Sequence, residues 1–444
     1  MSTPIAESPT QARQRTRSCA TALVCHRCEN SYPLAQAIFA CPDCNKGLDV
    51  VYDYEHAAQH FREVPSSERP QNIWHFEELL PIVDASAQAR VGQHSGYTPL
   101  IRADRLGAEL GLSNLYLKDD SSNRPSLSYK DRVVSMSVAR LLELGRTEIG
   151  CVSTGNVGTA VASLAAKAGV DAYVFYPNRL EDTKARACMA LGAKVCQVEG
   201  NYDEANKRCR EVAETTGMDF ANITLRPFYA EGAKTAAFEI VEQLDWQAPD
   251  HIVTAAAGGT LSSRLHKGLV ELQLLELSET DSTRIHIAQP SGCNPIATAI
   301  VAEEAEIHAV TPETAAHSLA IGNPGNGYLV IDAVLKRGGT GGFASDPEIF
   351  AGIDLLAATE GLLTEPAGGT TIAVLEKLAA TGRFAPDDTV VAIITGNGLK
   401  TRDDHPPKPW PAKVDCELDA MVAALDELKQ SGTLVDSARE LLHP

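Results

Sequence analysis

The sequence predicts an α/β fold in which parallel sheets are covered by helices and divided into two domains. From Thr98 onward, short runs rich in β-branched residues alternate with longer Ala/Leu-rich stretches. Such alternation is typical of parallel strands joined by crossover helices. With 444 residues, the chain is also too long for one hydrophobic core, which favours two or three domains.

The expected elements follow this alternation along the chain. The expected strands are 149–153, 172–176, 194–198, 251–255, 284–288 and 389–394. The expected helices are 133–144, 158–168, 203–215, 232–244, 261–274 and 349–359. The expected divisions are a disordered leader at 1–19, a cysteine-rich segment at 20–52, an irregular connector at 53–90, a main core at 91–410 with a smaller mobile subdomain at about 127–228, and C-terminal helices at 411–444.

The charge balance argues against two classes of partner. The chain has 39 basic and 58 acidic residues, and its net charge of −19 disfavours nucleic acid and anionic membranes. No stretch approaches the roughly 18 apolar residues that a bilayer span requires. Residues 1–18 lack the apolar core of a secretory signal, which leaves a disordered leader or an organelle transit peptide. Eleven cysteines, an odd number, favour a reducing compartment, the cytoplasm.

Two C-x-x-C pairs in the segment 20–52 predict a structural zinc ribbon. Cys25 and Cys28 form the first pair, and Cys41 and Cys44 form the second after 12 intervening residues. Four thiolates can meet in the tetrahedral geometry that zinc accepts, and they would leave no open position for catalysis. Two alternatives remain, a metal-free loop and a redox-active pair.

Lys130 is the candidate nucleophile. It lies in the polar loop 126–132, directly before an apolar helical stretch. An amine held at such a junction can be shielded from bulk water and used in covalent catalysis. A single lysine is most often a solvated surface charge, so the interpretation depends on other segments.

Three strand-to-turn segments supply partners for one ligand. Ser153, Thr154, Gly155 and Asn156 open a helix whose N-terminal N–H groups suit a carboxylate or phosphate, although the segment could also be an ordinary capped turn. The second segment consists of Ala257, Gly258, Gly259, Thr260 and Leu261. Its glycines allow backbone N–H groups to converge on a phosphate, although a plain glycine turn is the alternative interpretation.

Thr395 ends the expected strand 389–394, at the edge of a parallel sheet where ligands tend to lie. Its hydroxyl could bond a pyridine nitrogen, while the alternative is a plain turn. Together, a lysine, a carboxylate and phenolate loop, a phosphate loop and a pyridine partner match one cofactor, pyridoxal 5′-phosphate (PLP).

In this respect the chain resembles the fold-type II PLP enzymes and most closely the threonine synthases, including a subgroup with an N-terminal zinc ribbon. The likeness covers 82–402 and the ribbon. It rests on the motifs Tyr-Thr-Pro-Leu at 97–100, Ser-Tyr-Lys-Asp-Arg at 128–132, Glu-Gly-Ala-Lys-Thr at 231–235, Ala-Ile-Gly-Asn-Pro at 320–324 and Ile-Thr-Gly-Asn-Gly-Leu-Lys at 394–400.

The resemblance implies a role for each candidate residue. Lys130 would carry PLP, Asn156 would contact its O3′, 257–261 its phosphate and Thr395 its ring nitrogen. Ser153–Gly155 would receive the substrate carboxylate. The implied reaction converts O-phosphohomoserine and water to threonine and phosphate, and the implied assembly is a homodimer.

Two positions depart from the family pattern. The lysine loop reads Pro-Ser-Leu-Ser-Tyr-Lys where Pro-Thr-Gly-Ser-Phe-Lys is common, and Tyr229 stands where many members have an arginine near the substrate phosphate. Arg226 or Lys234 could supply the missing cation. Because of these departures, three other hypotheses about function remain. They are a cysteate synthase-like enzyme that uses O-phosphoserine and sulfite, a threonine or serine dehydratase, and a binding protein without catalytic activity.

Overall fold

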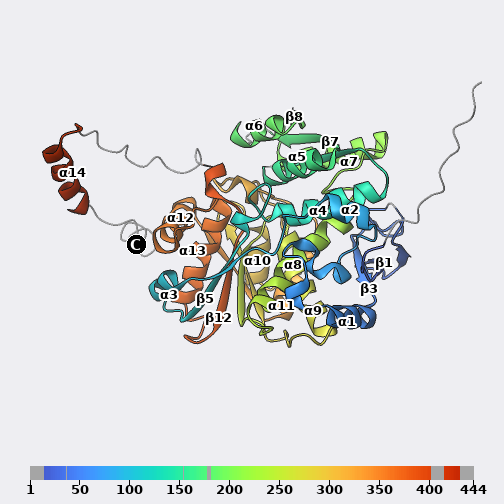
Figure 1. Ribbon diagram of the computed structural model, residues 1–444, viewed down its shortest axis with the longest axis horizontal. Helices are drawn as coiled ribbons and strands as arrows, with labels where there is room; N and C mark the ends of the chain where they lie inside the picture. The colour runs from blue at the N-terminus through green and yellow to red at the C-terminus, as the bar shows by residue number, and fades with distance from the viewer. Residues whose placement is uncertain (1–14, 37, 154, 178–181, 402–414, 431–444) are drawn as a thin grey trace, which may run out of the picture.

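Two parallel sheets and a small antiparallel sheet organise the chain (Figure 1). The computed structural model describes residues 15–36, 38–153, 155–177, 182–401 and 415–430. The α/β class expected from the sequence is confirmed, because all strand pairs of the two larger sheets are parallel except one at an edge.

The central sheet has the strand order β11-β10-β9-β12-β5-β4. Only the edge strand β4 runs antiparallel to its neighbour. The middle strands β9 and β12 are buried along almost their whole length because helices cover both faces. The strands are β4 (Leu100–Arg102), β5 (Asn114–Asp119), β9 (His251–Ala255), β10 (Arg284–Pro290), β11 (Thr340–Ala344) and β12 (Thr389–Ile394).

Helices pack on both sides of this sheet (Figure 1). Helix α13 lies against β9–β12, and α8 packs along α9. The helices are α3 (Asp104–Leu110), α8 (Arg226–Gln243), α9 (Thr260–Leu274), α10 (Pro295–Val301), α11 (Gly327–Lys336), α12 (Asp346–Glu360) and α13 (Pro366–Ala380). Short 3₁₀ turns are η3 (Asp120–Ser122), η4 (His317–Leu319) and η5 (Gly398–Lys400).

A second, three-stranded parallel sheet forms the smaller subdomain, which lies above the central sheet in Figure 1. Its strands are β6 (Glu148–Val152), β7 (Asp171–Pro177) and β8 (Lys194–Val198). Its helices are α4 (Lys130–Glu143), α5 (Asn156–Ala168), α6 (Asp182–Ala190) and α7 (Tyr202–Thr216).

Helix α4 joins the two sheets because it packs on both α5 and α8. At Gly232 the backbones of α4 and α8 are very close: an added Cβ would lie 2.3 Å from the carbonyl oxygen of Arg132. Only glycine permits this contact without a shift of one helix. The start of α4, and with it Lys130, is therefore fixed by its packing on α8.

The cysteine-rich segment forms an antiparallel sheet of order β2-β1-β3, at the right of Figure 1. Its strands are β1 (Ala20–Cys25), β2 (Ser31–Pro33) and β3 (Leu48–Tyr52). The connector that follows is mostly helical, whereas the sequence suggested an irregular segment. It consists of α1 (Tyr54–Glu63), η1 (Ser66–Glu68), η2 (Ile73–Leu79) and α2 (Ala85–Arg90).

Residues 15–19, which we expected in the disordered leader, are ordered against this connector. Thr16 N–H donates to the carbonyl of Val83, and the Ser18 hydroxyl donates to that of Leu80 at 2.5 Å. These two hydrogen bonds join residues that are 67 and 62 positions apart, so the local sequence pattern does not predict them. The remaining expected leader residues, 1–14, lie outside the described residues.

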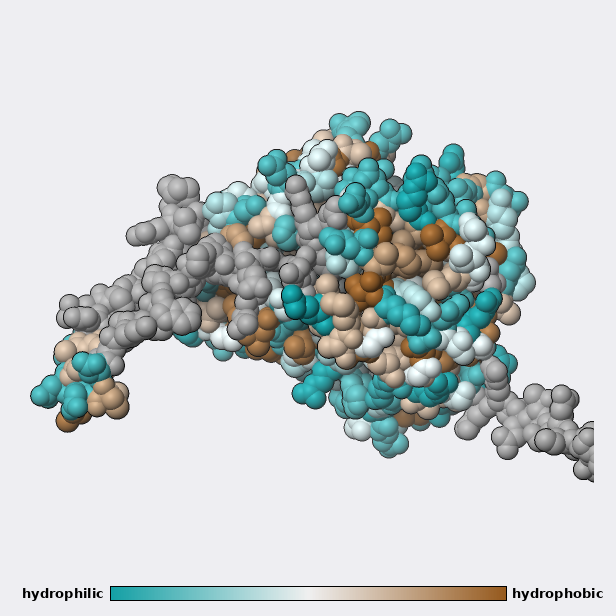
Figure 2. Space-filling model, turned by 90° about the horizontal axis from the view of Figure 1, so that it is seen from above, coloured by the Kyte–Doolittle hydropathy of each residue, from teal (hydrophilic) through white to brown (hydrophobic). Residues whose placement is uncertain are grey.

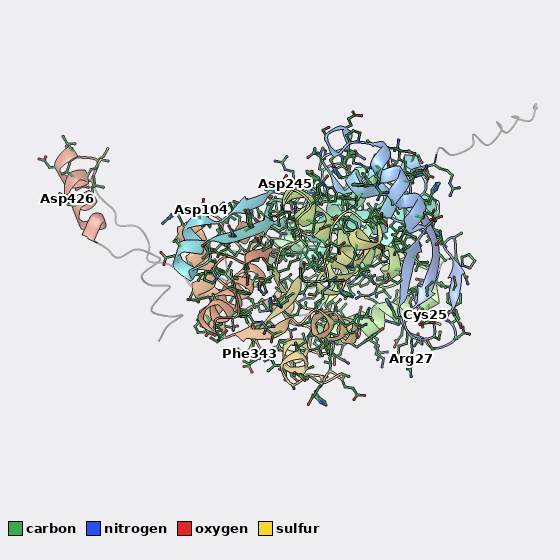
Figure 3. All side chains as sticks on the ribbon, turned by 90° about the horizontal axis from the view of Figure 1, so that it is seen from below. Cys25, Arg27, Asp104, Asp245, Phe343 and Asp426 are labelled. Atoms are coloured by element: carbon green, nitrogen blue, oxygen red, sulfur yellow. The ribbon has the colours of Figure 1, made fainter. Side chains whose placement is uncertain are left out.

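Helix α14 (Leu418–Gln430) falls within the expected C-terminal helical region, whose other members at 411–414 and 431–444 lie outside the described part. Figure 3 shows Asp426 of α14 at the opposite end of the molecule from Cys25 and Arg27 of the ribbon. No described helix combines the length and apolarity needed to cross a bilayer. On the face seen in Figure 2, hydrophilic side chains are widespread and apolar ones lie among them.

Candidate active site

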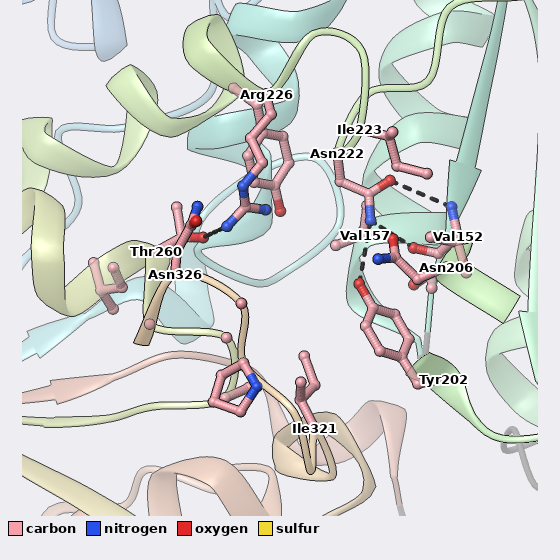
Figure 4. A pocket seen from close by; sticks show the side chains of 18 of the residues that line it. Val152, Val157, Tyr202, Asn206, Asn222, Ile223, Arg226, Thr260, Ile321 and Asn326 are labelled. Atoms are coloured by element: carbon pink, nitrogen blue, oxygen red, sulfur yellow. Dashed lines mark hydrogen bonds between the residues drawn. The ribbon is translucent and has the colours of Figure 1, made fainter. Parts of the chain in front are cut away.

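A cavity of ≈ 340 Å³ lies where the two parallel sheets and the ribbon meet. Val152 and Asn156 line it from the smaller subdomain, and 257–262 and Thr395 line it from the central sheet. Figure 4 shows Val152 and Thr260 on two sides of this cavity. These segments follow the carboxyl ends of β6, β9 and β12, where parallel sheets open toward ligands. Its size falls within the roughly 300–1,000 Å³ of small-molecule sites.

Lys130 is the first residue of α4 and lines this cavity. Its Nζ donates a hydrogen bond to Tyr129 Oη at 2.6 Å and lies 4.1 Å from the centre of the Tyr129 ring. The Tyr129 N–H donates to the carbonyl of Thr395 at 2.9 Å, and the Asn397 N–H donates to the carbonyl of Leu127 at 3.1 Å. Backbone pairing therefore holds the lysine loop against the end of β12.

Leu127 has φ = +59°, in the left-handed region that favours glycine. This is the position at which the family pattern has glycine, so the departure seen in the sequence falls on a backbone conformation that leucine adopts with strain. The loop nevertheless keeps its pairing with β12, because the surrounding hydrogen bonds fix it.

Asn156 is held from two sides by residues of the central-sheet domain. Its Nδ2 donates to Glu365 Oε2 at 2.5 Å, and its Oδ1 accepts from Lys400 Nζ at 2.6 Å. Lys400 also donates to the carbonyl of Ser126 at 2.7 Å, and buried Lys184 lies 3.1 Å from Glu365 Oε1. These contacts tie the start of α5 to the lysine loop.

The charge of Glu365 is stabilised inside this network. Burial alone would raise the pKa of its carboxyl, but the charges of Lys184 and Lys400 and the hydrogen bond from Asn156 lower the pKa below its ordinary value. Asp131, next to Lys130, shows the opposite balance: burial raises the pKa of its carboxyl to about 7, although Ser126 donates to it.

Ser153, Gly155 and Asn156, the described residues of the loop 153–156, form the start of α5. Ser153 lines the cavity, and its Oγ accepts the N–H groups of Gly155 and Gly158, both at 2.9 Å. Thr154 lies outside the described residues. Among the described residues that we expected in the site, Gly155 and Lys234 do not line the cavity.

The loop after β9 leads directly into α9, and all of Ala257, Gly258, Gly259, Thr260 and Leu261 line the cavity. Gly259 has φ = +81°, a conformation that strongly favours glycine. The first N–H groups of α9 lack acceptors within their own helix and meet the positive end of its dipole. Arg226 adds a guanidinium that donates to Thr260 Oγ1 at 3.2 Å (Figure 4), so the loop suits a phosphate.

Lys234 is fully buried away from the cavity, in contrast to its expected role at the substrate. Its Nζ lies 2.7 Å from the carboxylates of both Glu231 and Glu271. Tyr52 of the ribbon donates to Glu231 at 2.7 Å. Lys234 therefore belongs to the interface between α8, α9 and the ribbon.

Tyr229 of α8, Asn222 and Tyr202 also line the cavity. Tyr229 is 3% exposed, and burial raises the pKa of its hydroxyl, which stays neutral. Asn222 bridges β6 and Tyr202 by donating to the carbonyl of Val152 at 2.8 Å and to Tyr202 Oη at 3.5 Å (Figure 4).

The four ribbon cysteines converge on one point. Their Sγ atoms all lie within 4.8 Å of one another, with separations of 3.4 Å for Cys25–Cys44, 3.5 Å for Cys28–Cys41 and 3.7 Å for Cys28–Cys44. Tetrahedral zinc with Zn–S bonds of about 2.3 Å requires separations of about 3.8 Å. All four are free thiols, so the cluster fits a metal ion closely.

Comparison with known proteins identifies the class. A family described as pyridoxal-phosphate dependent enzyme matches residues 91–396. The chain belongs to this family of PLP-dependent enzymes. Solved structures share the fold: diaminopropionate ammonia lyase of Escherichia coli superposes with a TM-score of 0.61 at 18% identity over 86% of this chain and 95% of that one. Threonine deaminase isoform 2 of Solanum lycopersicum gives 0.58 at 20% identity over 70% and 88%.

Within that class the chain is a threonine synthase-like lyase. It is 34% identical to a threonine synthase of Methanocaldococcus jannaschii over 407 residues, which cover 91% of this chain and 99% of that protein. It is also 34% identical to a threonine synthase of Methanosarcina acetivorans over 383 residues, 85% of this chain and 92% of that protein.

Sequence reasoning missed two kinds of residue. Glu365 was not expected at the site, although it precedes Pro366 at the start of α13, a recognisable helix-start signal. Lys400 appeared only as the last residue of the family motif 394–400, with no expected role. The ribbon residues that line the cavity, Phe39 and Lys46 among them, had no signal at all, because the sequence does not show where the ribbon docks.

Proposed function

We propose that the protein is a threonine synthase, which converts O-phosphohomoserine and water to threonine and phosphate. One observation carries this proposal: Lys130, Asn156, the loop 257–261 and Thr395 line a single cavity in a chain that aligns with threonine synthases along most of its length. At 34% identity the comparison supports the reaction class, and the substrate is part of the proposal.

The residues of the cavity fit PLP. Lys130 Nζ would bind the cofactor covalently, and Asn156 would contact its O3′. The N–H groups of 258–261, with Arg226, would hold its phosphate, and Thr395 Oγ1 would bond its ring nitrogen. When bound, PLP stabilises negative charge that develops on the substrate carbons.

The chain's own residues then move protons and orient the substrate. Ser153 and the start of α5 bind the substrate carboxylate, which presents Cα to Lys130 Nζ. Lys130 Nζ removes the α-proton and holds it beside Tyr129 Oη. A proton leaves Cβ and phosphate leaves Cγ. A proton then adds at Cγ, which becomes the methyl group, water adds its hydroxyl at Cβ, and a proton returns to Cα to give threonine. Asn222 and Tyr202 form part of the cavity wall around these groups.

Tyr229 favours one second candidate, a β-replacement enzyme that uses O-phosphoserine and sulfite. A neutral tyrosine at a wall of the cavity is compatible with a shorter substrate. The test compares phosphate release by the holoenzyme from O-phosphohomoserine with release from O-phosphoserine plus sulfite, and identifies the amino-acid product by chromatography. Threonine formation from the first substrate supports the proposal. Turnover of the second alone would replace it.

We also propose that zinc occupies the four-cysteine cluster and that the chain is a homodimer. Exposed apolar side chains on α14, which would be covered in a dimer, are consistent with the second point. They are Leu418, Met421, Val422 and Leu425. Sedimentation of the full chain at twice the mass of one chain supports the dimer, and a single-chain mass contradicts it.

A further inference from the structure

The ribbon forms part of the wall of the cavity. Five ribbon residues on either side of the second cysteine pair line the cavity: Phe39, Ala40, Asn45, Lys46 and Gly47. Ala40 and Gly47 pair across an isolated antiparallel bridge, and the Cys41 N–H donates to the carbonyl of Lys46 at 2.8 Å. The lining segment is therefore the same short loop that carries Cys41 and Cys44.

A buried charged interface holds this loop in place. Lys267 of α9 donates to Asp49 at 2.8 Å and to the carbonyl of Val50 at 2.6 Å, both on ribbon strand β3. Arg264 of the same helix pairs with Asp49. Because α9 begins at the phosphate loop, the ribbon is docked on the helix that positions that loop.

Four described cationic side chains line the cavity: Lys46, Lys130, Arg210 and Arg226. Two have local partners, since Lys130 donates to Tyr129 and Arg226 donates to Thr260. Lys46 and Arg210 instead lie against aromatic rings. Lys46 Nζ is 5.9 Å from the Tyr328 ring centre, and the Arg210 guanidinium is 5.7 Å from the Phe39 ring centre.

We propose that Lys46 of the ribbon, assisted by Arg210 of α7, binds the phosphate group of the amino-acid substrate. An aromatic ring attracts a cation through its charge and does not accept all of the cation's N–H hydrogen bonds. The N–H groups of Lys46 and Arg210 can therefore still donate to a phosphate. They supply the positive charge that Tyr229 lacks, and they do so from two elements that meet at Phe39. Asp203 also lines the cavity, and its carboxylate is hydrogen-bonded by the backbone of Gly322 and Asn323.

This inference rests on the proposed function, since it assigns a subsite to the phosphorylated substrate. It makes the ribbon a part of the substrate site. The loop that carries Cys41 and Cys44 also carries Lys46. Metal binding by the cysteines would therefore hold a substrate-binding residue in place, although the metal itself takes no part in the reaction.

The test uses the PLP-loaded, full-length protein and two matched pairs of variants. Lys46→Ala is compared with Arg27→Ala, an exposed cation in the other cysteine pair that lies at the outer edge of the ribbon (Figure 3). Arg210→Ala is compared with Arg208→Ala, which lies on the same helix and pairs with Glu211 at 2.6 Å. Neither control residue lines the cavity among the described residues.

Kinetics provide the first readout. Lys46→Ala should raise KM for O-phosphohomoserine at least about tenfold, with kcat changed far less, because a charge-assisted contact to the ground state is lost. Arg210→Ala should act in the same direction, and both controls should behave as wild type. Unchanged KM in Lys46→Ala would overturn the inference and leave the proposed function intact.

Binding of inorganic phosphate provides a readout that does not depend on turnover. In the holoenzyme the cofactor fills its own phosphate site, so calorimetry with inorganic phosphate measures the substrate subsite. The wild type should bind it, and Lys46→Ala should weaken binding at least about tenfold. If O-phosphohomoserine is not turned over, the proposed function fails while this measurement still decides the anion site. No phosphate binding by the wild type, or equal binding by Lys46→Ala, would overturn the inference.

Discussion

The side chain of Asn156 donates a hydrogen bond to Glu365 Oε2 at 2.5 Å, across the boundary between the smaller subdomain and the central sheet. Lys400 completes the arrangement by donating to Asn156 Oδ1 at 2.6 Å. A side-chain amide can present either end to a ligand, and these two partners fix which end points where. The orientation of the residue proposed to contact O3′ is thus set by residues more than 200 positions away in sequence.

Replacement of Glu365 by glutamine should loosen the cofactor site. The variant leaves Lys184 and Lys400 without the buried negative charge that both face, and Lys184 and Asn156 then compete for the one oxygen that glutamine keeps. PLP affinity should fall about tenfold or more, and the visible absorption band of the bound cofactor should shift. Glu348→Gln, on neighbouring α12 and paired with the half-buried Lys377, serves as the control. Unchanged affinity and spectrum would remove Glu365 from the site.

Lys130→Ala should abolish turnover and the covalent link to PLP. Treatment of the wild type with borohydride should fix the cofactor on the peptide that contains Lys130, as read by mass spectrometry, because no other proposed residue supplies the amine. Lys194→Ala, an exposed lysine on β8, should retain both properties. Activity near that of the wild type in Lys130→Ala would show that another lysine carries the cofactor.

Glu239→Gln should destabilise the protein by about 3 kcal/mol at neutral pH, because it breaks a buried ion pair. Burial alone would raise the pKa of Glu239, but Arg132 and Lys118 hold the pKa at about 2. Since this pKa lies below its ordinary value, the stabilising charge is present above pH 4.5 and is lost as pH falls toward 2.

The urea unfolding midpoints of wild type and Glu239→Gln should therefore converge as the pH is lowered from 7 to 3. Glu214→Gln, on the exposed face of α7, should track the wild type throughout. A difference that stays constant with pH would show that the ionised carboxylate of Glu239 does not stabilise the fold.

The cysteine cluster should bind one zinc ion per chain, measured by elemental analysis. Cys41→Ser should lower zinc content and weaken substrate binding, because the same loop carries Lys46 to the cavity. Cys196→Ser, an exposed thiol outside the cluster, should leave the zinc content unchanged. If two of the cysteines form a redox pair instead, the protein as purified should contain no zinc. Mild oxidation of this metal-free protein should then remove two free thiols.

Much of the site could be predicted because its signals are local. Strands such as 251–255 and 389–394 appear in the structure with the expected bounds, since apolar β-branched runs of that length fit a buried parallel sheet. Helix α13 was missed because its Gly-Gly-Thr-Thr start weakens the helical signal, although it is buried against the central strands. Tertiary packing overrode local propensity there.

The sequence by itself determined the α/β class, the cofactor family and the four-cysteine cluster, because each depends on residue types at short spacings. Only the tertiary structure decided that Lys234 is buried in an ion-pair interface, that Glu365 and Lys400 orient Asn156, and that Lys46 reaches the cavity. These relationships depend on which surfaces meet. Burial of a charge is tolerated only where partners converge from distant segments, and such convergence leaves no periodic or local pattern in the chain.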